Sequence, residues 1–448
     1  MLNVEIIATS ELGDRSYVVH DDQHAIVIDP QRDIDRIEHL LDARRLTLAI
    51  VLETHIHNDY VTGGLALSAK RQADYGIAAE ANVDFSRKAL ADGDVLEIGT
   101  LKVEIVATPG HTDNHLAFIV EDDQGLRVLF SGGSLLYGSV GRTDLLGSHL
   151  TEELSRAQFR SAHDLAARLD DAVALYPTHG FGSFCSSGNA TGGDASTVGI
   201  ERMQNDVFLA PDEDTFVKNL IANLSEYPSY YTHMGPLNLI GPDAPELGYV
   251  NTVDPDELGA RIRSGEWVID LREADLFAIH HLSGTLSITV GNSFSTYVGW
   301  LIPWDARITL IAEGREELLV AQRQLVRIGI DQRMQAAVGA VENLASGIEF
   351  SHYPSVVFAD VPADGSVTIV DVRRHDEREE RHIVGSIHLS IVELAAHMQE
   401  LPKVTLWVHC ASGFRASIAS SMLARAGFDV VLINDDFSSA ANTRLVLS

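Results

Sequence analysis

Several histidines in the first half of the chain are spaced like metal ligands. His55 and His57 are separated by one residue in THIHNDY, and Asp59 follows them. Two further histidines stand in short turns, His111 in ATPGH and His179 in YPTHG. Imidazole and carboxylate groups are ligands that Zn²⁺ and Fe²⁺ take from proteins. These five side chains are therefore candidate ligands of a divalent metal ion.

The elements that must position these histidines are strands. A single histidine is more often a solvated loop residue or a satisfied core residue than a ligand. Here, however, the histidines follow apolar runs that read LAIVLE, VEIVATPG and AVALYP. Apolar and β-branched runs that end in turn residues predict strands. Polar residues at the ends of successive strands are therefore expected to converge on one edge of a sheet sandwich.

A reactive thiol is predicted near the other end of the chain, in WVHCASGFRASIASSMLARAG. Cys410 ends an expected strand, and the loop from Ala411 to Phe414, with Ser412 and Gly413, precedes Arg415 and an amphipathic helix. A helix N-terminus favours the thiolate form of a nearby cysteine. The loop is one residue shorter than a tyrosine-phosphatase loop, so it suits a sulfur atom carried as a persulfide. The alternative is a buried structural cysteine.

An internal repeat lies in the second half of the chain. WVIDLREADLFAIHHLSGTLSI matches VTIVDVRRHDEREERHIVGSIHLSI, which aligns Asp270 with Asp371 and Gly284 with Gly385. Strand, loop, helix and glycine recur in the same order in both copies. The first copy has Gly314 at the position that aligns with Cys410, so we expect a packing or docking domain that carries no sulfur.

The length of 448 residues favours two or three domains. We place the boundaries at 1–250, 251–350 and 351–448, and the first range includes a connector rich in Tyr and Pro. The formal net charge of −31 argues against a nucleic-acid partner or an anionic membrane. No apolar run is long enough for a membrane span, and the first residues lack the pattern of a signal peptide. We therefore expect a cytoplasmic location, and a homo-oligomer is left open.

The motifs of the last domain resemble the rhodanese family of sulfurtransferases. The resemblance includes Asp371–Val–Arg373 and GSIHL in addition to the cysteine loop. It implies that Cys410 accepts and passes on a sulfane sulfur, that Arg415 steadies the loop and the charged substrate, and that Ser412 and Gly413 line the substrate site.

The histidine motifs of the first domain resemble the metallo-β-lactamase fold, whose signature is His-x-His-x-Asp-His followed by Gly-His-Thr, Gly-Asp and a late His. The resemblance implies an α/β protein, with an αββα sandwich followed by two rhodanese-like α/β domains. The fusion is similar to the persulfide dioxygenase–rhodanese proteins, and GRTD, from Arg142 to Asp144, fits that branch. This implies a mononuclear site, Fe(II) favoured and Zn possible, that oxidises a glutathione-type thiol persulfide to sulfite.

Two positions depart from the signature. Tyr60 stands at its last histidine, and Gly133 replaces the aspartate of the Gly-Asp motif. Both losses disfavour a dinuclear hydrolase, and the second also removes a carboxylate ligand of the family's iron. The resemblance thus implies one divalent metal ion bound by His55 and His111 with His57 close, and Asp59 and His179 are less certain ligands. His57, or an oxygen group such as Asp113 or Asp144, would have to replace the lost carboxylate.

Three further residues of the first half, Arg142, His115 and Cys185, have expected roles. Arg142 is expected to bind the carboxylates of the thiol, and a surface salt bridge is the alternative. His115 is expected in a core or supporting role, and Cys185 as a packed thiol. The expected partners are a small thiol persulfide and sulfite or thiosulfate. Two other functions stay open: a thioester hydrolase, and a persulfide-binding first domain beside an active rhodanese.

Overall fold

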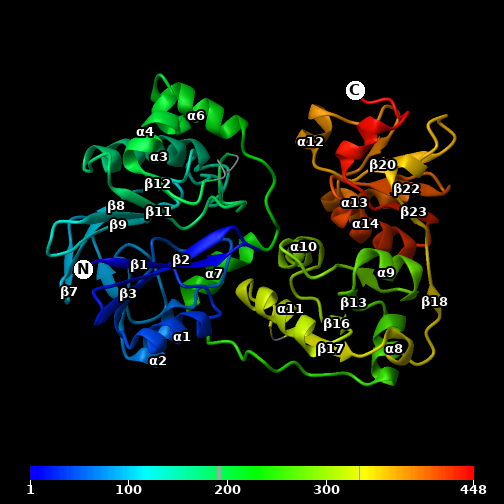
Figure 1. Ribbon diagram of the computed structural model, residues 1–448, viewed down its shortest axis with the longest axis horizontal. Coiled ribbons are helices and arrows are strands. Elements are labelled where there is room, and N and C mark those ends of the chain that lie inside the picture. The colour runs from blue at the N-terminus through cyan, green and yellow to red at the C-terminus, as the bar shows by residue number, and fades with distance from the viewer. Residues whose placement is uncertain (189–192, 332) are drawn as a thin grey trace. The chain divides into compact units, whose positions relative to one another are not determined.

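The computed structural model describes residues 1–448 apart from 189–192 and 332. The chain forms two compact units. Unit 1 is Met1–Glu246 together with Leu325–Gly329, and unit 2 is Leu247–Gln324 together with Ile330–Ser448. Figure 1 colours the elements of unit 1 mostly from blue to green and those of unit 2 from green to red. No helix among the described residues is both long enough and apolar enough to cross a membrane.

Unit 1 contains two six-stranded sheets. The strands of the first sheet, in spatial order, are β1 (Asn3–Thr9), β2 (Asp14–His20), β3 (His24–Ile28), β4 (Thr47–Leu52), β5 (Asp74–Ala78) and β6 (Lys88–Leu90). Those of the second are β12 (Ser196–Thr197), β11 (Ala174–Pro177), β10 (Arg127–Gly132), β9 (Leu116–Glu121), β8 (Leu101–Ala107) and β7 (Val95–Ile98). The pairs from β3 to β6 are parallel, as is β10 with β11, and the others are antiparallel.

The period of two along β9 explains why the second sheet is buried on both faces. Leu116, Phe118 and Val120 pack into the core shared with the first sheet. Ala117 and Ile119 point to the other face and pack into the core beneath the helices. Successive side chains of a strand point to opposite faces, so a nearly continuous apolar run fits a strand that is covered twice.

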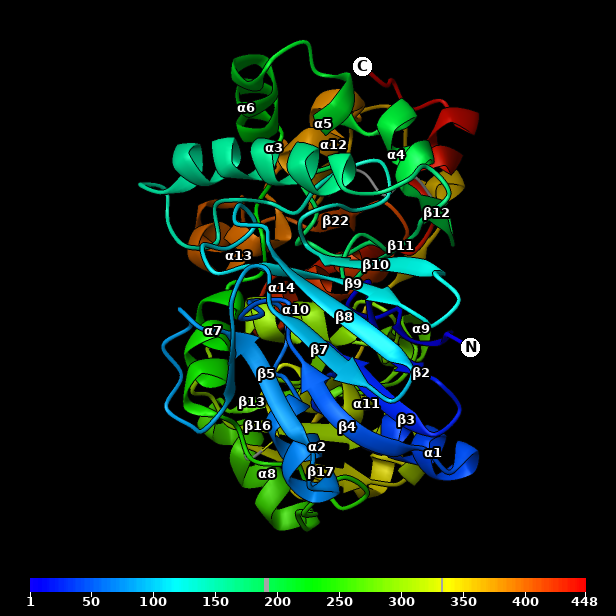
Figure 2. The same ribbon diagram turned by 90° about the vertical axis from the view of Figure 1, so that its left-hand side faces the viewer.

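Helices cover the outer faces of the two sheets, which gives an αββα sandwich. They are α1 (Asp35–Arg44), α2 (Gly64–Arg71), α3 (Thr151–Ala167), α4 (Val198–Gln204), α5 (Asp206–Leu209), α6 (Glu213–Ala222) and α7 (Tyr231–Ile240). Figure 2 shows α3 and α4 over the second sheet and α1 and α2 on the far side of the first. Leu165 of α3 and Phe216 of α6 belong to the core beneath the second sheet.

Unit 2 contains two mainly parallel sheets, ordered β15-β13-β16-β17 and β19-β23-β22-β20-β21. The elements of the first part are α8 (Pro255–Ser264), β13 (Trp267–Asp270), α9 (Ala274–Ile279), β14 (His281–Leu282), β15 (Leu286–Ser287), α10 (Phe294–Leu301), β16 (Ile308–Ala312), α11 (Arg315–Arg327), β17 (Met334–Val338) and β18 (Phe350–Ser351). Those of the second part are β19 (Ser355–Val356), β20 (Thr368–Asp371), α12 (His375–Glu380), β21 (Ile387–His388), α13 (Ile391–His397), β22 (Leu406–His409), α14 (Phe414–Arg425) and β23 (Val430–Ile433). Strands β14 and β18 pair separately.

The internal repeat extends to individual hydrogen bonds. Arg272 binds both carboxylate oxygens of Asp270, at 3.0 and 2.7 Å, at the end of β13. Arg373 binds Asp371 in the same way, at 3.0 and 2.8 Å, at the end of β20. In both copies the central strand therefore ends in the same buried Asp-x-Arg pair. The aligned acids of the sequence hold corresponding places in two α/β folds.

Candidate functional site

The candidate metal ligands of unit 1 lie in loops that follow three strands. His55 and His57 follow β4, His111 follows β8, and His179 follows β11. All four histidines are buried. Strand ends from both sheets therefore bring together residues that are distant in the sequence.

His55, His111 and His179 form a three-histidine group. Each offers a ring nitrogen, and these nitrogens all lie within 4.8 Å of one another. The Nε2 atoms of His55 and His179 are 3.3 Å apart. Two imidazole nitrogens bound to one tetrahedral metal ion are separated by about 3.3 Å when each bond is about 2.0–2.1 Å long. The donor atoms therefore fit a single divalent ion.

His111 is prepared as a ligand by its own hydrogen bond. Its Nδ1 donates to the main-chain oxygen of Arg142 at 2.7 Å, which leaves the Nε2 lone pair free. That Nε2 is buried and has no hydrogen-bond partner. Burial lowers the pKa of His111 to about 3, so the ring is neutral at physiological pH. A buried, unpaired imidazole nitrogen is costly unless a ligand satisfies it.

The other two histidines of this group are oriented by hydroxyl and carboxylate groups. His55 Nδ1 is 2.9 Å from Thr54 Oγ1, and that hydroxyl donates to Asp29 at 2.7 Å. His179 Nδ1 is 2.8 Å from Asp14 Oδ1. Such partners fix the ring and turn the opposite nitrogen toward a metal ion.

Two carboxylates share the outer nitrogen of His179. Asp59 Oδ2 lies 3.1 Å from this Nδ1, on the same nitrogen as Asp14. Burial and the nearby Asp59 raise the pKa of Asp14 to about 8. Burial lowers the pKa of His179, but Asp59 and Asp14 outweigh it and raise the pKa well above its usual range. The pair thus makes His179 a more basic ligand than an isolated imidazole.

His57 lies beside His55, with ring centroids 4.1 Å apart. Its Nε2 lies 3.2 Å from Asp29 Oδ1, 3.2 Å from Glu53 Oε2 and 3.0 Å from the Tyr60 hydroxyl. Its Nδ1 is buried without a partner, and it forms a second candidate group with Asp59 and His179. Burial opposes protonation, but Asp29 and Glu53 raise the pKa of His57 to about 9.

Of the ligands expected from the sequence, His55 and His111 lie in one group with the further candidate His179. His57 lies in the neighbouring group with Asp59 and His179. The reason is the pair of buried carboxylates, which holds the Nε2 atom of His57.

The thiol loop of unit 2 lies between β22 and α14. Cys410 is buried, and Gly413 has the positive φ of 89° at the start of α14. Glycine is required there for a second reason, because a Cβ would lie 2.0 Å from Asn434 Oδ1. Phe437 N donates to Ala411 O at 2.8 Å and closes the loop from the other side. Ser412 is exposed.

Arg415 is already paired in this loop. Its Nη1 and Nη2 atoms donate to the two carboxylate oxygens of Glu377 at 2.5 and 2.7 Å. Glu377 belongs to α12, so the ion pair ties α12 to the first turn of α14. Paired guanidinium and carboxylate groups are rigid. The geometry supports the loop-steadying part of the expected role of Arg415.

The cysteine-free repeat braces the thiol loop within unit 2. Ser287 Oγ lies 2.7 Å from Ser417 Oγ, and Ser287 N donates to Ser421 Oγ at 3.0 Å. The ring of Tyr297 packs edge-on against Phe414 at 5.6 Å. These contacts attach β15 and α10 to the helix that follows Cys410, which accords with the expected packing role of this repeat.

Comparison with known proteins follows the same division of the chain. A model of the metallo-beta-lactamase superfamily matches residues 12–179, and a model of the rhodanese-like domain matches residues 358–442. A metallo-beta-lactamase structure from Staphylococcus aureus subsp. aureus COL is 25% identical, covers 76% of this chain and 99% of its own, and has a TM-score of 0.67. This chain carries a metallo-beta-lactamase domain and a C-terminal rhodanese-like domain. The α/β fold expected from the sequence is thereby confirmed.

The curated relatives match mainly the metallo-beta-lactamase domain. Hydroxyacylglutathione hydrolase of Albidiferax ferrireducens is 32% identical over 36% of this chain and 60% of its own length. Persulfide dioxygenase ETHE1, mitochondrial, of Homo sapiens is 27% identical over 48% of this chain and 75% of its own length. The chain spans 65% and 60% of the first two hydrolases that it matches.

Two residues of the metallo-beta-lactamase domain replace signature ligands. Tyr60 is fully buried and stacks on the ring of His57, with centroids 4.3 Å apart. Gly133 faces His111, and a Cβ at this position would lie 2.3 Å from His111 Cδ2. The imidazole of His111 therefore occupies the space that the side chain of an aspartate would enter.

Arg142 fits neither description given by the sequence. It is 1% exposed, and its guanidinium binds both carboxylate oxygens of Asp144 at 2.7 and 2.8 Å. It also donates to the main-chain oxygens of Phe184 and Ser225, at 3.0 and 2.7 Å. Because these partners already surround the guanidinium, Arg142 is a buried structural residue and does not present a free anion-binding group. Its carbonyl, which accepts from His111, is its link to the metal centre.

The compensating carboxylates also differ from those expected. Asp113 is exposed, and Asp144 is bound by Arg142. The carboxylate groups near the histidines are instead Asp59, which was a candidate, and residues that the sequence reasoning missed: Asp14, Asp29 and Glu53. Asp29 ends the apolar run HAIVID and Asp14 begins β2, so a search of all strand ends for acids would have found them.

His115 and Cys185 have supporting places. His115 Nε2 accepts from Gly133 N at 2.9 Å, and its ring stacks on His55 with centroids 4.8 Å apart. Cys185 is fully buried, and burial raises its pKa well above the usual range. Neither side chain belongs to a candidate metal group among the described residues.

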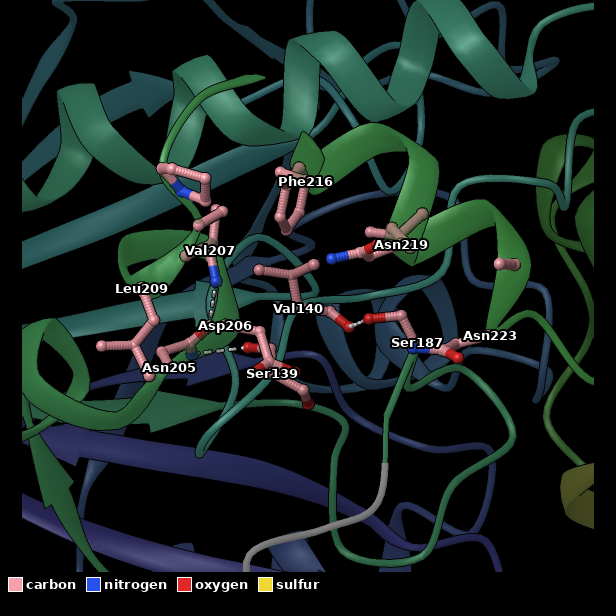
Figure 3. Close-up of a pocket in the computed structure, with 14 residues that line it drawn as sticks. Ser139, Val140, Ser187, Asn205, Asp206, Val207, Leu209, Phe216, Asn219 and Asn223 are labelled. Carbon is pink, nitrogen blue, oxygen red and sulfur yellow. Dashed lines mark hydrogen bonds between the residues drawn. The ribbon is translucent and has the colours of Figure 1, made fainter. Parts of the chain in front are cut away.

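A separate cavity of about 340 Å³ lies between the loop at Ser139 and Val140 and helix α6. Figure 3 shows Asn219 and Asn223 on its wall. None of the histidines of the metal centre lines this cavity. It is therefore distinct from the candidate metal site.

Proposed function

We propose that the protein couples metal-dependent oxidation of a small thiol persulfide to sulfur transfer at Cys410. The observation that carries the first part is the 3.3 Å separation of the His55 and His179 Nε2 atoms beside the unpaired Nε2 of His111. Three imidazole donors on one centre suit a mononuclear ion, Fe(II) favoured and Zn possible. When bound, Fe(II) would supply the redox chemistry by which O₂, with one water molecule, oxidises the terminal sulfur of a glutathione-type persulfide to sulfite and releases the thiol and two protons.

The chain's own residues would hold and tune this centre. Asp29 orients His55 through the Thr54 hydroxyl, and Asp14 orients His179 directly. Burial of the histidines excludes bulk water, which strengthens the electrostatic interactions among them. Arg142, although buried, fixes the third histidine through its main-chain oxygen.

Sulfur transfer in unit 2 needs only the thiol loop. The Cys410 thiolate attacks the outer sulfur of thiosulfate, the sulfur–sulfur bond breaks, and sulfite leaves with the bonding electron pair. Cys410 then carries a persulfide, whose outer sulfur passes to an acceptor thiolate or cyanide while the Cys410 thiolate re-forms. In the reverse direction, sulfite made by unit 1 takes the outer sulfur from the Cys410 persulfide and becomes thiosulfate.

A thioester hydrolase is the second candidate, and one observation favours it. His57 Nδ1 and Asp59 Oδ1 are both buried without partners, and they group with His179 as possible ligands of a second ion. Two metal ions would activate water for hydrolysis. A content of two metal ions per chain, with thioester hydrolysis, would favour this function over the oxygenase.

The experiment that tests the proposal combines metal analysis with oxygen uptake. The purified full chain is loaded with Fe(II), and oxygen consumption is followed with glutathione persulfide. We expect about one iron per chain and uptake that depends on both iron and persulfide. Uptake equal to the blank would leave only the rhodanese-like domain active, with unit 1 as a binding module.

A further inference from the structure

Helix α7 of unit 1 makes three hydrogen bonds to the metal-binding loop through one side chain. Asn238 Nδ2 donates to the main-chain oxygens of His57 at 2.8 Å and Tyr60 at 2.9 Å. Asn238 Oδ1 accepts from the main-chain N–H of Thr62 at 2.9 Å. The Asn238 side chain is buried, and its residue is 2% exposed. One amide therefore satisfies three main-chain groups between residues 57 and 62.

The chemistry of these contacts requires an amide. The two main-chain oxygens need two N–H donors, and the Thr62 N–H needs an acceptor on the same side chain. Asparagine offers both kinds of group. An aspartate of the same size would keep the acceptor but place a carboxylate against two carbonyl oxygens. Alanine would leave three buried main-chain groups to find other partners.

A second contact brings α7 close to the same loop. Gly235 lies one turn before Asn238, and residues three apart lie on the same face of a helix. A Cβ on Gly235 would lie 3.0 Å from Asn58 Oδ1, the residue between His57 and Asp59. The absence of a side chain at Gly235 thus lets the helix approach closely enough for Asn238 to reach the loop.

The loop held in this way carries His57 and also Asp59, whose Oδ2 lies 3.1 Å from Nδ1 of His179 in the three-histidine group. The ring of His57 is anchored at Nε2 by Asp29 and Glu53, while its main chain is held by Asn238. Asp59 lies between the two carbonyls that Asn238 binds, and its Oδ1 has no hydrogen-bond partner. The backbone position of this loop therefore decides where His57 Nδ1 and Asp59 Oδ1 stand relative to His179.

We propose that Asn238 is a positioning residue of the metal centre, acting through the main chain of the loop from His57 to Thr62. This inference rests on the proposed metal centre. It assigns to α7 a part in metal binding, although the superfamily match ends at residue 179.

The test uses the full chain and Zn(II) alone as the probe. Zn(II) affinity is measured by competition with a chelating dye for wild type, Asn238→Ala and Asn238→Asp. Loss of a supporting partner weakens metal binding by about 10–100-fold, and we expect this for both variants. The control is Asn219→Ala, because Asn219 lines the separate cavity of Figure 3 and should leave the affinity unchanged. Thiosulfate–cyanide exchange at Cys410 reports that each variant protein is folded in unit 2.

Hydrogen exchange and the Gly235→Ala variant provide two further tests of the role of Asn238. In the metal-free protein, hydrogen exchange of the main-chain amides from 57 to 62 should be faster in the Asn238 variants than in wild type. Gly235→Ala is a milder change and should weaken Zn(II) binding less than Asn238→Ala does. If both Asn238 variants keep the wild-type Zn(II) affinity and the wild-type amide exchange, the proposed role of Asn238 is wrong. It is also wrong if Asn219→Ala weakens Zn(II) binding as much as the Asn238 variants do. If an Asn238 variant loses the fold of unit 1, the Gly235→Ala result decides, and wild-type Zn(II) affinity there would overturn the inference. A wild-type protein that binds no Zn(II) and no Fe(II) would instead refute the proposed metal centre.

Discussion

The Nε2 atom of His55 lies 3.3 Å from the Nε2 atom of His179, although the two residues are 124 positions apart in the sequence. The outer nitrogens of both rings are held by hydroxyl or carboxylate oxygens, so the facing nitrogens are positioned to share one ligand. This relationship makes His179 a member of the main metal group. Asp29 and Glu53 hold His57 in a separate position.

Replacement of His111 or of His179 by alanine should therefore remove the bound metal ion. We expect His111→Ala and His179→Ala each to weaken metal binding by more than the roughly 10–100-fold that loss of an outer partner causes. Metal content after gel filtration, determined by mass spectrometry, provides the measurement. His149→Ala is the matched control because His149 is exposed. Unchanged metal content in His179→Ala would show that the triad is assigned wrongly.

Gly133 should not tolerate a side chain. A Cβ at this position would lie 2.3 Å from His111 Cδ2, so any added side chain crowds the His111 ring. We expect Gly133→Ala and Gly133→Asp to lower metal affinity, and crowding of this kind costs about 1–3 kcal/mol of stability. Thermal unfolding and metal titration provide the measurements. Tighter metal binding by Gly133→Asp would contradict the observed position of His111.

Cys410→Ser should abolish sulfur transfer and leave the metal centre intact. The serine hydroxyl is a poor nucleophile at neutral pH and cannot carry a sulfane sulfur, so thiosulfate–cyanide exchange should fall by about 1,000-fold or more. Cys185→Ser provides the matched control, since Cys185 is a buried thiol of unit 1. Retained exchange in Cys410→Ser would remove the case for this cysteine.

The Glu377–Arg415 pair predicts how unit 2 responds to acid. Burial would raise the pKa of Glu377, but hydrogen bonds from Arg415 outweigh it and lower that pKa below its usual value. A depressed carboxyl pKa contributes stability that is present above the unfolded-state pKa of about 4.3 and is lost as the pH falls through the folded-state value. We expect full stabilisation from about pH 6 to pH 8 and a loss below about pH 4.

Glu377→Gln is the matching variant. Because a neutral amide binds the guanidinium less strongly, we expect a loss of about 1–2 kcal/mol at pH 7 and a smaller decrease in acid than in wild type. Denaturant unfolding of the full chain at several pH values, followed by a signal from unit 2, provides the measurement. The same acid sensitivity in both proteins would show that the ion pair does not control this response.

Local patterns in the sequence account for most of the fold but only part of the site. The apolar runs, the Asp270 and Asp371 repeat and the turn at Gly413 depend on short-range chemistry, so they are visible in the sequence. The choice between His57 and His179 depends on where buried carboxylates lie in three dimensions. Asn238 gave no signal, because an asparagine in a helix acquires its role only when the helix packs on a distant loop.

Oxygen uptake by the iron-loaded full chain with glutathione persulfide shows whether the three-histidine group binds a catalytic iron ion. We expect sulfite formation and oxygen consumption that are lost in His179→Ala and His111→Ala and retained in Cys410→Ser. Uptake at the level of the blank in an iron-loaded protein, or uptake that persists in His179→Ala, would contradict this expectation.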